Sequence, residues 1–198
     1  MSGICGIVLA AGASRRLGRP KQTLALGDTT VLGWVMRSAE ASSLARVVVV
    51  LGGAGAEVRA SLRPRRADLV DHEGYASGSA SSLRAGIGAA GACDAAMVVL
   101  GDMPGVGADV IDTVGAGWQR HRQDMARASY RGRPGHPVVV PASRFPELCA
   151  LDGDKALWAL LEADPRRVRP VELDRPLPVD VDTWDDYGAV RRELEAGR

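Results

Sequence analysis

The sequence predicts an α/β fold in three layers, with helices on both faces of a mostly parallel central sheet. Short apolar runs alternate along the chain with helix-like stretches, and most runs end in glycine-rich or acidic turns. This alternation is typical of folds in which each strand is followed by a helix. A chain of 198 residues with 46% hydrophobic content can bury one sizeable core, so we expect residues 1–198 to form a single domain.

The first half of the chain supplies the parallel part of the predicted sheet. Apolar runs predict strands over residues 4–10, 46–51, 67–72 and 95–100. The segments around them predict helices over 31–41, 56–62 and 83–90. The run 95–100 consists of six apolar residues, as expected for a central strand that is buried on both faces.

The second half predicts an antiparallel addition and further helices. Residues 125–132 and 136–141 read as extended segments joined by an irregular turn, which we interpret as a small antiparallel flap. Helices are predicted over 143–151 and 154–163, followed by an extended piece over 167–173. A terminal helix is predicted over 183–197, with Thr183 at its N-cap.

Composition narrows the classes of function. Lys and Arg total 25 against 24 Asp and Glu, so we expect neither nucleic acid nor a membrane surface as a partner. No apolar run approaches the roughly 20 residues of a membrane span, and the start of the chain lacks the charged segment of a secretory signal, so we expect a cytoplasmic protein. The cysteines and histidines show no zinc-binding spacing, and the cysteines are expected to be buried free thiols. A metal ion would therefore be held by carboxylates.

The segment LAAGASRRLGRPK, residues 9–21, directly follows the first predicted strand. Ligands of open parallel sheets bind at the carboxyl ends of strands, and glycine lets backbone N–H groups approach a phosphate. Its spacing is neither that of a Walker loop nor Gly-X-Gly-X-X-Gly. Arg15, Arg16, Arg19 and Lys21 can surround a polyphosphate. The alternative is a solvated basic loop.

Carboxylates follow two later segments. Asp102 comes after the strand 95–100, at the same sheet edge as the opening loop, and is a candidate magnesium ligand or a cap of the following turn. Asp180 and Asp182 are two residues apart, so an extended segment would point both to one face, where they repel unless a cation lies between them. Asp185 and Asp186 fall in the first turn of the terminal helix and are interpreted as structural.

The serine-rich turn GYASGSASSLRAG, residues 74–86, precedes the third predicted helix. Its glycines and hydroxyls suit backbone contacts to a base or a phosphate. The alternative is a flexible turn in which Ser79 or Ser81 caps the helix.

Residues 9–21 resemble the signature Leu-Ala-Ala-Gly-X-Ser-X-Arg-(Met/Leu)-Gly-X-X-Lys of the nucleotidyltransferases that activate molybdopterin, particularly the CTP:molybdopterin cytidylyltransferases. More distantly, they resemble the sugar-phosphate nucleotidylyltransferases. The resemblance implies a Rossmann-like nucleotidyltransferase fold and a loop that wraps a nucleoside triphosphate, with Arg16 and Lys21 on its phosphates. The guanylyl relatives tend to read Leu-Ala-Gly-Gly, so Ala11 favours CTP over GTP. The nucleotide-binding residues implied here are Leu9, Ala10, Ala11, Gly12, Ser14, Arg16 and Lys21.

Further segments match the same family in its order. Gly78 and Ser82 fit an element that faces the base and ribose, which continues through Leu83, Arg84 and Gly86. The sequence GDMP resembles the family's metal-binding element, so Asp102 and Asp182 are the implied Mg²⁺ ligands, with Asp180 a weaker one. GHP, residues 135–137, resembles an element on the acceptor side and places His136 near the incoming phosphate. A structural hydrogen-bonding role is the alternative for His136.

One family element is altered. The family commonly reads Gly-Asp-X-Gly-Ala-Arg where this chain reads GDKALW, residues 153–158. Gly153 and Asp154 are kept, but Trp158 stands where an acceptor-binding arginine is expected. Lys155 and Arg144 are the cations that could substitute for it.

These observations together predict Mg²⁺-dependent transfer of CMP from CTP to the terminal phosphate of molybdopterin, with release of pyrophosphate. Arg16, Lys21 and Asp102 are the predicted catalytic residues. Two alternatives remain at this stage. The enzyme could use GTP or another phosphorylated acceptor, such as a sugar phosphate or a small phospho-acid. The chain could also be a non-catalytic carrier that holds a nucleotide or pterin for a partner molybdoenzyme.

Overall fold

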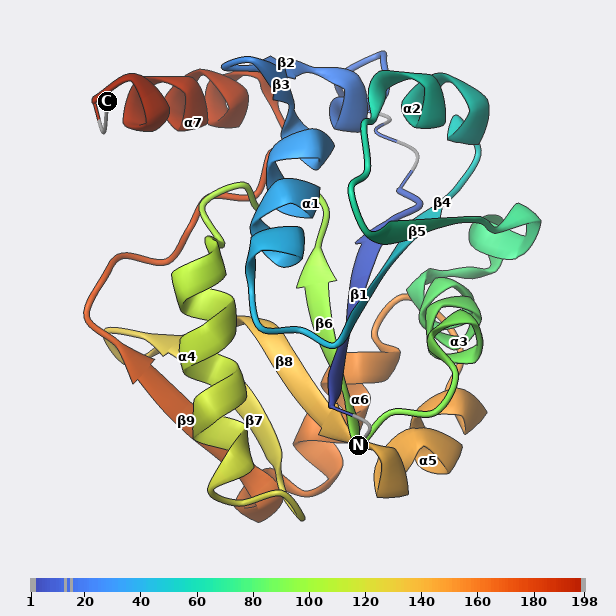
Figure 1. The fold of residues 1–198 in the computed structure, drawn as a ribbon, viewed down its shortest axis with the longest axis vertical. Coiled ribbons are helices and arrows are strands. Elements are labelled where there is room, and N and C mark those ends of the chain that lie inside the picture. The colour runs from blue at the N-terminus through green and yellow to red at the C-terminus, as the bar shows by residue number, and fades with distance from the viewer. Residues whose placement is uncertain (1–2, 13, 15, 197–198) are drawn as a thin grey trace.

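A seven-stranded sheet forms the centre of the computed structural model, which describes residues 3–12, 14 and 16–196 (Figure 1). The strand order is β5-β4-β1-β6-β8-β7-β9. Its strands are β1 Ile4–Ala10, β4 Arg46–Leu51, β5 Ala67–Asp71, β6 Ala95–Leu100, β7 Met125–Tyr130, β8 Arg133–Pro141 and β9 Val168–Leu173.

Most neighbouring strands of this sheet are parallel. β1 pairs in parallel with β4 and β6, β4 with β5, and β7 with β9. β8 is antiparallel to both β6 and β7. The antiparallel pairing expected between residues 125–132 and 136–141 is therefore confirmed, and both strands belong to the central sheet. A small separate antiparallel sheet is formed by β2 Ala25–Leu26 and β3 Thr29–Thr30.

Helices cover both faces of the sheet, as the sequence predicts (Figure 1). Side chains of α1, α2 and α4 pack in one core cluster, and those of α3, α5 and α6 pack in the cluster on the opposite face. Val190 of α7 joins a third cluster with Leu17, Leu24 and Val31. The helices are α1 Val31–Ala41, α2 Gly55–Ser61, α3 Ser79–Ala90, α4 Ala108–Gln119, α5 Phe145–Ala150, α6 Ala156–Ala163 and α7 Trp184–Ala196.

The predicted N-cap of α7 is confirmed. The backbone N–H of Asp186 donates to Thr183 Oγ1 at 3.2 Å, while the Asp186 carboxylate accepts from the backbone N–H of Thr183 at 2.8 Å. This reciprocal pair satisfies two donors at the helix start. Asp186 is thus structural, as expected.

The helix α4 is absent from the sequence-based prediction. Its buried side chains Val110, Ile111, Val114 and Trp118 recur at helical spacing and face the sheet. Gly115 and Gly117 lie within it, and glycine is among the weakest helix formers, which obscured the pattern. The cysteines are free thiols as expected, but only Cys5 is buried; Cys93 and Cys149 are partly exposed.

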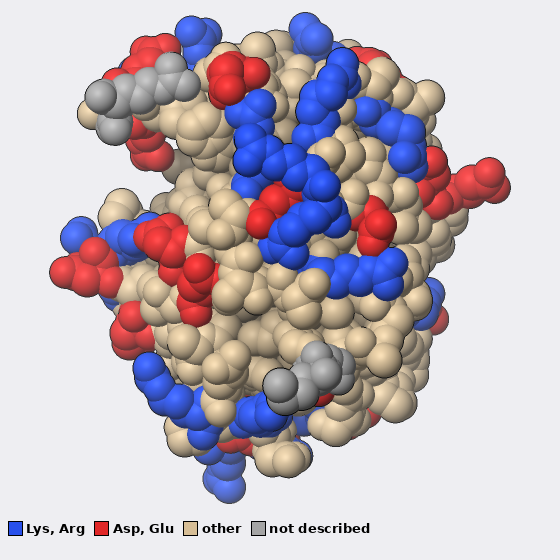
Figure 2. Space-filling view, in the orientation of Figure 1, with Lys and Arg blue, Asp and Glu red and all other residues tan. Residues whose placement is uncertain are grey.

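Charged side chains of both signs occupy the surface (Figure 2). Lys and Arg gather in the upper part of the face shown, with Asp and Glu among them. Ion pairs such as Arg37 with Asp28 and Arg59 with Asp71 neutralise several arginines. No helix in the described part of the chain is both long and apolar enough to cross a membrane.

The two outer strands of the sheet carry polar residues. β5 exposes Asp68 and Asp71, and β9 exposes Arg169, Pro170 and Glu172. Each of these strands therefore ends the sheet with charged side chains or with a residue that lacks a backbone N–H.

Candidate functional site

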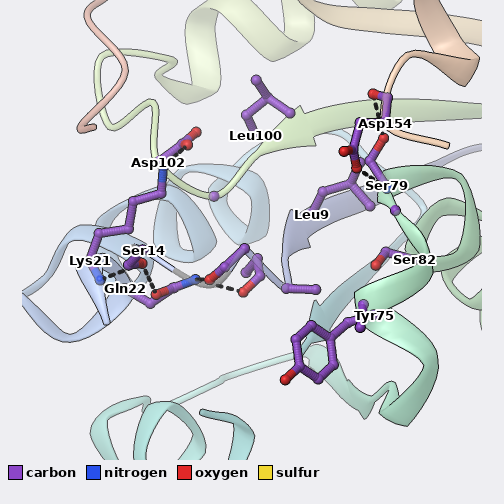
Figure 3. Close-up of a pocket in the computed structure, with 16 residues that line it drawn as sticks. Leu9, Ser14, Lys21, Gln22, Tyr75, Ser79, Ser82, Leu100, Asp102 and Asp154 are labelled. Atoms are coloured by element: carbon purple, nitrogen blue, oxygen red, sulfur yellow. Dashed lines mark hydrogen bonds and ion pairs between the residues drawn. The ribbon is translucent and has the colours of Figure 1, made fainter. Parts of the chain in front are cut away.

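A cavity of about 580 Å³ lies at the carboxyl ends of β1 and β6 (Figure 3). This is the sheet edge where ligands of open α/β folds bind. The sequence-predicted residues that line it are Leu9, Ala10, Ala11, Gly12, Ser14, Lys21, Gly78, Ser82 and Asp102. The cavity is also lined by residues that the prediction did not assign to the site, among them Gln22, Tyr75, Ser79, Gly101 and Asp154.

Close backbone packing shapes this cavity. A Cβ atom at Gly52, just after β4, would clash with the carbonyl oxygen and Cα of Ala11. Gly78 has a φ of 107°, a conformation that side-chain-bearing residues rarely adopt, and a Cβ there would lie 2.8 Å from the carbonyl carbon of Gly153. Glycine at both positions lets neighbouring segments approach the loop and the start of α3.

Gln22 ties the opening loop back onto the end of β1. Its Nε2 donates to the carbonyl oxygens of Ala10 and Gly12, both at 2.9 Å. Ser14 Oγ accepts from the backbone N–H of Lys21 at 2.9 Å and donates to Gln22 Oε1 at 3.3 Å. Gln22 is only 4% exposed, so these bonds satisfy a buried amide. No spacing rule marks a glutamine for this task, and sequence analysis missed it.

Lys21 joins the two predicted metal ligands. Its Nζ lies 2.5 Å from Asp102 Oδ2 and 2.7 Å from Asp182 Oδ1. Arg16 reaches the other Asp182 oxygen at 2.6 Å. The side chains of Lys21 and Asp102 are 12% and 19% exposed, whereas Arg16 is largely in solvent. The structure thus brings together four side chains that the sequence nominated from three distant segments.

The ionisation of these groups reflects burial and pairing. Burial opposes the charge of Lys21, but Asp102 and Asp182 outweigh it and raise the pKa of the ammonium. Burial also raises the pKa of Asp102, and the nearby Lys21 charge partly offsets this effect. The hydrogen bond from Lys21 lowers the pKa of Asp182 despite some burial. A protonated Lys21 therefore lies between the two carboxyl groups at neutral pH.

The same carboxylates fit a divalent cation. Asp102 Oδ1 is buried and has no hydrogen-bond partner, while Asp102 Oδ2 and Asp182 Oδ1 converge on the Lys21 ammonium. Among the residues that the structure describes, no group of three or more His, Cys, Asp or Glu could hold a metal ion. Mg²⁺ is commonly bound by one or two carboxylates together with substrate phosphates and water. A cation here would fit that pattern.

The altered family element contributes to the other side of the cavity. The backbone N–H of Ser79 donates to Asp154 Oδ1 at 3.0 Å, and that of Ala80 donates to the Gly153 carbonyl at 3.1 Å. Asp154 therefore caps α3 from a distant segment, and neither Ser79 nor Ser81 does so through its side chain. α3 therefore begins at Ser79 and not at the predicted residue 83. The prediction missed this start because the capping residue is remote in sequence. Arg84 donates to the carbonyls of Cys149 and Leu151, which is a structural contact.

Four sequence-predicted site residues are not among those that line this cavity: Arg16, His136, Asp180 and Asp182. Arg16 and Asp182 contact each other beside it. His136 is 6% exposed on β8, its Nδ1 is 3.4 Å from the Val98 carbonyl, and its ring packs edge-on against Trp158. Burial lowers the pKa of His136 to about 4, so the ring is neutral at pH 7. Asp180 does not line the cavity, although it acts electrostatically on Asp102.

The remaining cations of the prediction that the structure describes lie elsewhere. Arg144 is buried and pairs with Glu147 at 2.8 Å and Asp164 at 3.9 Å, so it is engaged within the fold rather than offered to an acceptor. Arg19 and Lys155 are exposed. Arg15 lies outside the described residues.

Residues 6–169 match the family model described as a MobA-like NTP transferase domain. The chain is 33% identical to nicotine blue oxidoreductase of Paenarthrobacter nicotinovorans, covering 91% of this chain and 92% of that protein. It is 27% identical to the molybdenum cofactor cytidylyltransferase of Escherichia coli, covering 94% and 95%. A crystal structure of Rv0371C from Mycobacterium tuberculosis in complex with manganese is similar, with a TM-score of 0.83, 32% identity and coverage of 96% and 99%.

Proposed function

Because the chain belongs to the family of MobA-like NTP transferase domains and is a nucleotidyltransferase, we propose that it transfers CMP from CTP to the terminal phosphate of molybdopterin and releases pyrophosphate. The observation that carries this proposal is the convergence of Lys21, Asp102 and Asp182 beside a loop that can cradle phosphates. A pure carrier needs no such combination of a cation-binding carboxylate pair and a phosphate-binding lysine.

The triphosphate binds along the loop that follows β1. Gln22 holds the carbonyls of Ala10 and Gly12, which leaves the loop shaped before the ligand arrives. Arg16 and Lys21 supply positive charge for the phosphate oxygens, and Arg16 is exposed enough to turn toward an arriving ligand. Gly78 and Ser82 at the opposite wall face the nucleoside.

Asp102 and Asp182 would hold the divalent ion, for which Mg²⁺ is our choice. An ion there would supply positive charge to the phosphate oxygens and make the reacting phosphorus more electrophilic. Lys21 occupies the space between the two carboxylates in the structure, so it turns from them toward the phosphates when the ion binds. The crystal structure of the related Rv0371C with manganese supports a divalent ion in this family.

The reaction is an in-line substitution at the α-phosphorus. An oxygen of the acceptor phosphate forms the new bond, and the bond from the α-phosphorus to the bridging oxygen breaks, so that pyrophosphate leaves with both bonding electrons. Arg16 and Lys21 stabilise the leaving charge. A phosphate monoester is largely ionised at neutral pH, so the attack requires no strong general base. The buried, neutral His136 is consistent with a reaction that uses no general base on the acceptor side.

The choice of substrates rests on narrower support. Ala11 lines the cavity and favours CTP through its resemblance to the cytidylyl branch. The similarity to the Escherichia coli cytidylyltransferase favours molybdopterin as acceptor. The replacement of the expected arginine by Trp158 supports a second candidate, in which the same chemistry serves another phosphorylated acceptor.

The test is pyrophosphate release by the purified protein with Mg²⁺. CTP, GTP, ATP and UTP are offered separately with molybdopterin and then with a panel of phosphorylated acceptors. We expect selective release with CTP and molybdopterin. Release only with another pair would replace the substrates and keep the chemistry, whereas binding of nucleotide without release from any pair would contradict an enzymatic function.

Asp102→Asn tests the assigned ion ligand in the same assay. We expect most turnover to be lost while the urea unfolding midpoint remains close to that of the wild type, because the amide keeps the shape of the side chain but has no charge. Asp68→Asn is the matched control and should retain full turnover, because it removes only an exposed pair between Asp68 of β5 and Arg46 of β4. Equal activity of Asp102→Asn and wild type would refute the role of Asp102.

A further inference from the structure

A second cavity, of about 650 Å³, lies between α6 and the strands β7, β8 and β9. It shares no lining residue with the cavity at the ends of β1 and β6. Its walls combine apolar residues with a cation and two carboxylates. The residues important here are Arg127, Ser129, Pro134, Trp158, Glu162 and Glu172.

Arg127 is a cation on the face of the sheet that packs against α6. Strand residues alternate between faces, so Arg127 of β7 lies on the side of Met125, which packs in the core cluster of α3, α5 and α6. The pairing of β7 with β8 shifts register between Arg127 and Ser129, an irregularity of the kind that redirects side chains near functional sites. The Arg127 guanidinium lies 5.3 Å from the ring centroid of Trp158.

Arg127 has no carboxylate within ion-pair distance among the residues that the structure describes. Burial alone lowers the pKa of its guanidinium, and no acidic neighbour counteracts the shift. Removing a charge from water without a counter-charge is unfavourable. A half-buried cation facing a cavity is therefore suited to a ligand that brings the anion.

Arg122 shows what the same arrangement looks like when it serves only the fold. Its guanidinium lies 5.2 Å from the ring centroid of Trp118, nearly the distance seen for Arg127. Arg122, however, also pairs with Asp94 at 2.6 Å. The pair of Arg127 with Trp158 thus differs from the pair of Arg122 with Trp118 in that Arg127 has no carboxylate partner among the described residues.

One residue of the second cavity, Trp158, contacts His136, which lies against the strand β6. Trp158 contacts the ring of His136 edge-on at 5.9 Å, and His136 reaches the Val98 carbonyl of β6, the strand that leads to Asp102. Arg127 and Asp180 both act on the charge of His136, and Asp180 also acts on Asp102. The resemblance predicts His136 on the acceptor side, so an anion beside Arg127 would lie on the side expected for the acceptor.

We propose that Arg127, oriented by the ring of Trp158, binds the anionic group of the acceptor and so supplies the positive charge that the resemblance predicts at position 158. The ligand is a small molecule that carries a phosphate and also has hydrogen-bond donors. Glu162 and Glu172 on the cavity wall would accept hydrogen bonds from those donors. Arg127 is in this sense a specificity-determining residue. The inference rests on the proposed function for the identity of that ligand as the acceptor.

The first experiment measures binding without turnover. Inorganic phosphate is titrated into the full chain, and Trp158 fluorescence is obtained as the difference between wild type and Trp158→Phe. We expect a saturable change that weakens about tenfold or more in Arg127→Gln, as for loss of a hydrogen bond to a charged group. Arg122→Gln should bind phosphate like the wild type. Equal affinity of wild type and Arg127→Gln, or no Trp158 signal in the wild type, would overturn the proposal.

A variant that keeps the charge shows whether lost phosphate binding is due to the lost charge or to a disturbed fold. Arg127→Lys keeps a cation beside Trp158, so we expect it to retain most of the phosphate affinity that Arg127→Gln loses. If both variants lose binding equally while their unfolding midpoints match the wild type, charge is not the determinant and the proposal fails.

The second experiment uses an acceptor that supports pyrophosphate release. We expect Arg127→Gln to raise the KM for that acceptor about tenfold and to leave the KM for CTP unchanged. An unchanged acceptor KM would refute the role of Arg127 and leave the proposed function intact. Absence of release with every nucleotide and acceptor would refute the proposed function, while the phosphate titration still decides whether Arg127 binds an anion.

Discussion

Lys21 makes the central contact of the site, because its ammonium pairs with the carboxylates of both Asp102 and Asp182. Sequence analysis nominated Lys21 for phosphate and Asp102 and Asp182 for a metal ion, and the structure places all three together. The sequence could not predict that the ammonium would lie between the two carboxyl groups proposed to bind the ion. Lys21 is separated by 81 and 161 residues from these partners, so their contact depends on where three chain segments end in space.

Lys21→Met is expected to lower the free energy of unfolding by about 2 kcal/mol, because two partly buried carboxylates then face each other without a cation. Added Mg²⁺ should restore more stability to this variant than it adds to the wild type, since the ion no longer has to displace an ammonium. Urea unfolding with and without Mg²⁺ measures both effects.

Arg37→Met provides the control for that measurement. Arg37 pairs with Asp28 at the surface, far less buried than Lys21, and its loss should leave the response to Mg²⁺ unchanged. An identical Mg²⁺ response in Lys21→Met and wild type would contradict the placement of the ion between Asp102 and Asp182.

The helices show how local signals succeed and fail at the scale of elements. The predicted helix 31–41 matches α1 because its apolar face lies within the segment and its cap, Thr30, immediately precedes it. The start of α3 was misplaced because its capping group, Asp154, lies 75 residues away. α4 was missed because two glycines weaken the helical signal, although its buried side chains have the correct spacing. Boundaries that depend on distant residues cannot be obtained from a local pattern.

Two glycines of α3 provide a matched test of its packing. Gly86 faces β1 and β4, where an added Cβ would clash with Ile7 and lie 3.1 Å from Val50 Cγ2. Gly88 has no heavy atom within 4 Å of such a Cβ. We expect Gly86→Ala to destabilise by roughly 1–3 kcal/mol through overpacking and Gly88→Ala to stabilise by up to about 1 kcal/mol through helix propensity. Urea unfolding of the two variants should move in opposite directions, and a shared sign would show that the helix does not pack as described.

The sheet as a whole determines where the site lies. The chain passes from β1 to β4 and β5 on one side and then returns to β6 on the other. The loops that follow β1 and β6 therefore meet at the same edge, and this meeting could be predicted from alternating apolar runs and the carboxyl-end rule. The membership of β7, β8 and β9 in the same sheet could not be predicted, because β8 enters antiparallel and its partners are set by tertiary packing.

Global stability should depend on pH through His136. Its folded pKa is about 4 against an ordinary value of 6.5, so between these values the unfolded chain binds a proton that the folded chain does not. The free energy of unfolding therefore falls as the pH is lowered from 6.5 to 4, by about 3 kcal/mol from this residue. Arg127, whose charge opposes protonation, and Asp180, whose charge favours it, both act on the ring.

His136→Gln isolates this contribution. The variant lacks the titrating ring, so its unfolding free energy should fall less steeply over the same pH range, while carboxylate titration affects both proteins alike. Urea unfolding at a series of pH values from 7 to 4 provides the comparison. Parallel curves for the two proteins would show that the ring is not buried in its neutral form.

The outer strands have a consequence for the behaviour of the protein in concentrated solution. An added strand from a second molecule would have to pair with β5, beside Asp68 and Asp71, or with β9, beside Arg169, Pro170 and Glu172. Desolvating those charges, or pairing with a residue that has no N–H to donate, makes such growth unfavourable. The sheet is thereby protected against edge-to-edge aggregation, even though its central strands are among the most apolar segments of the chain.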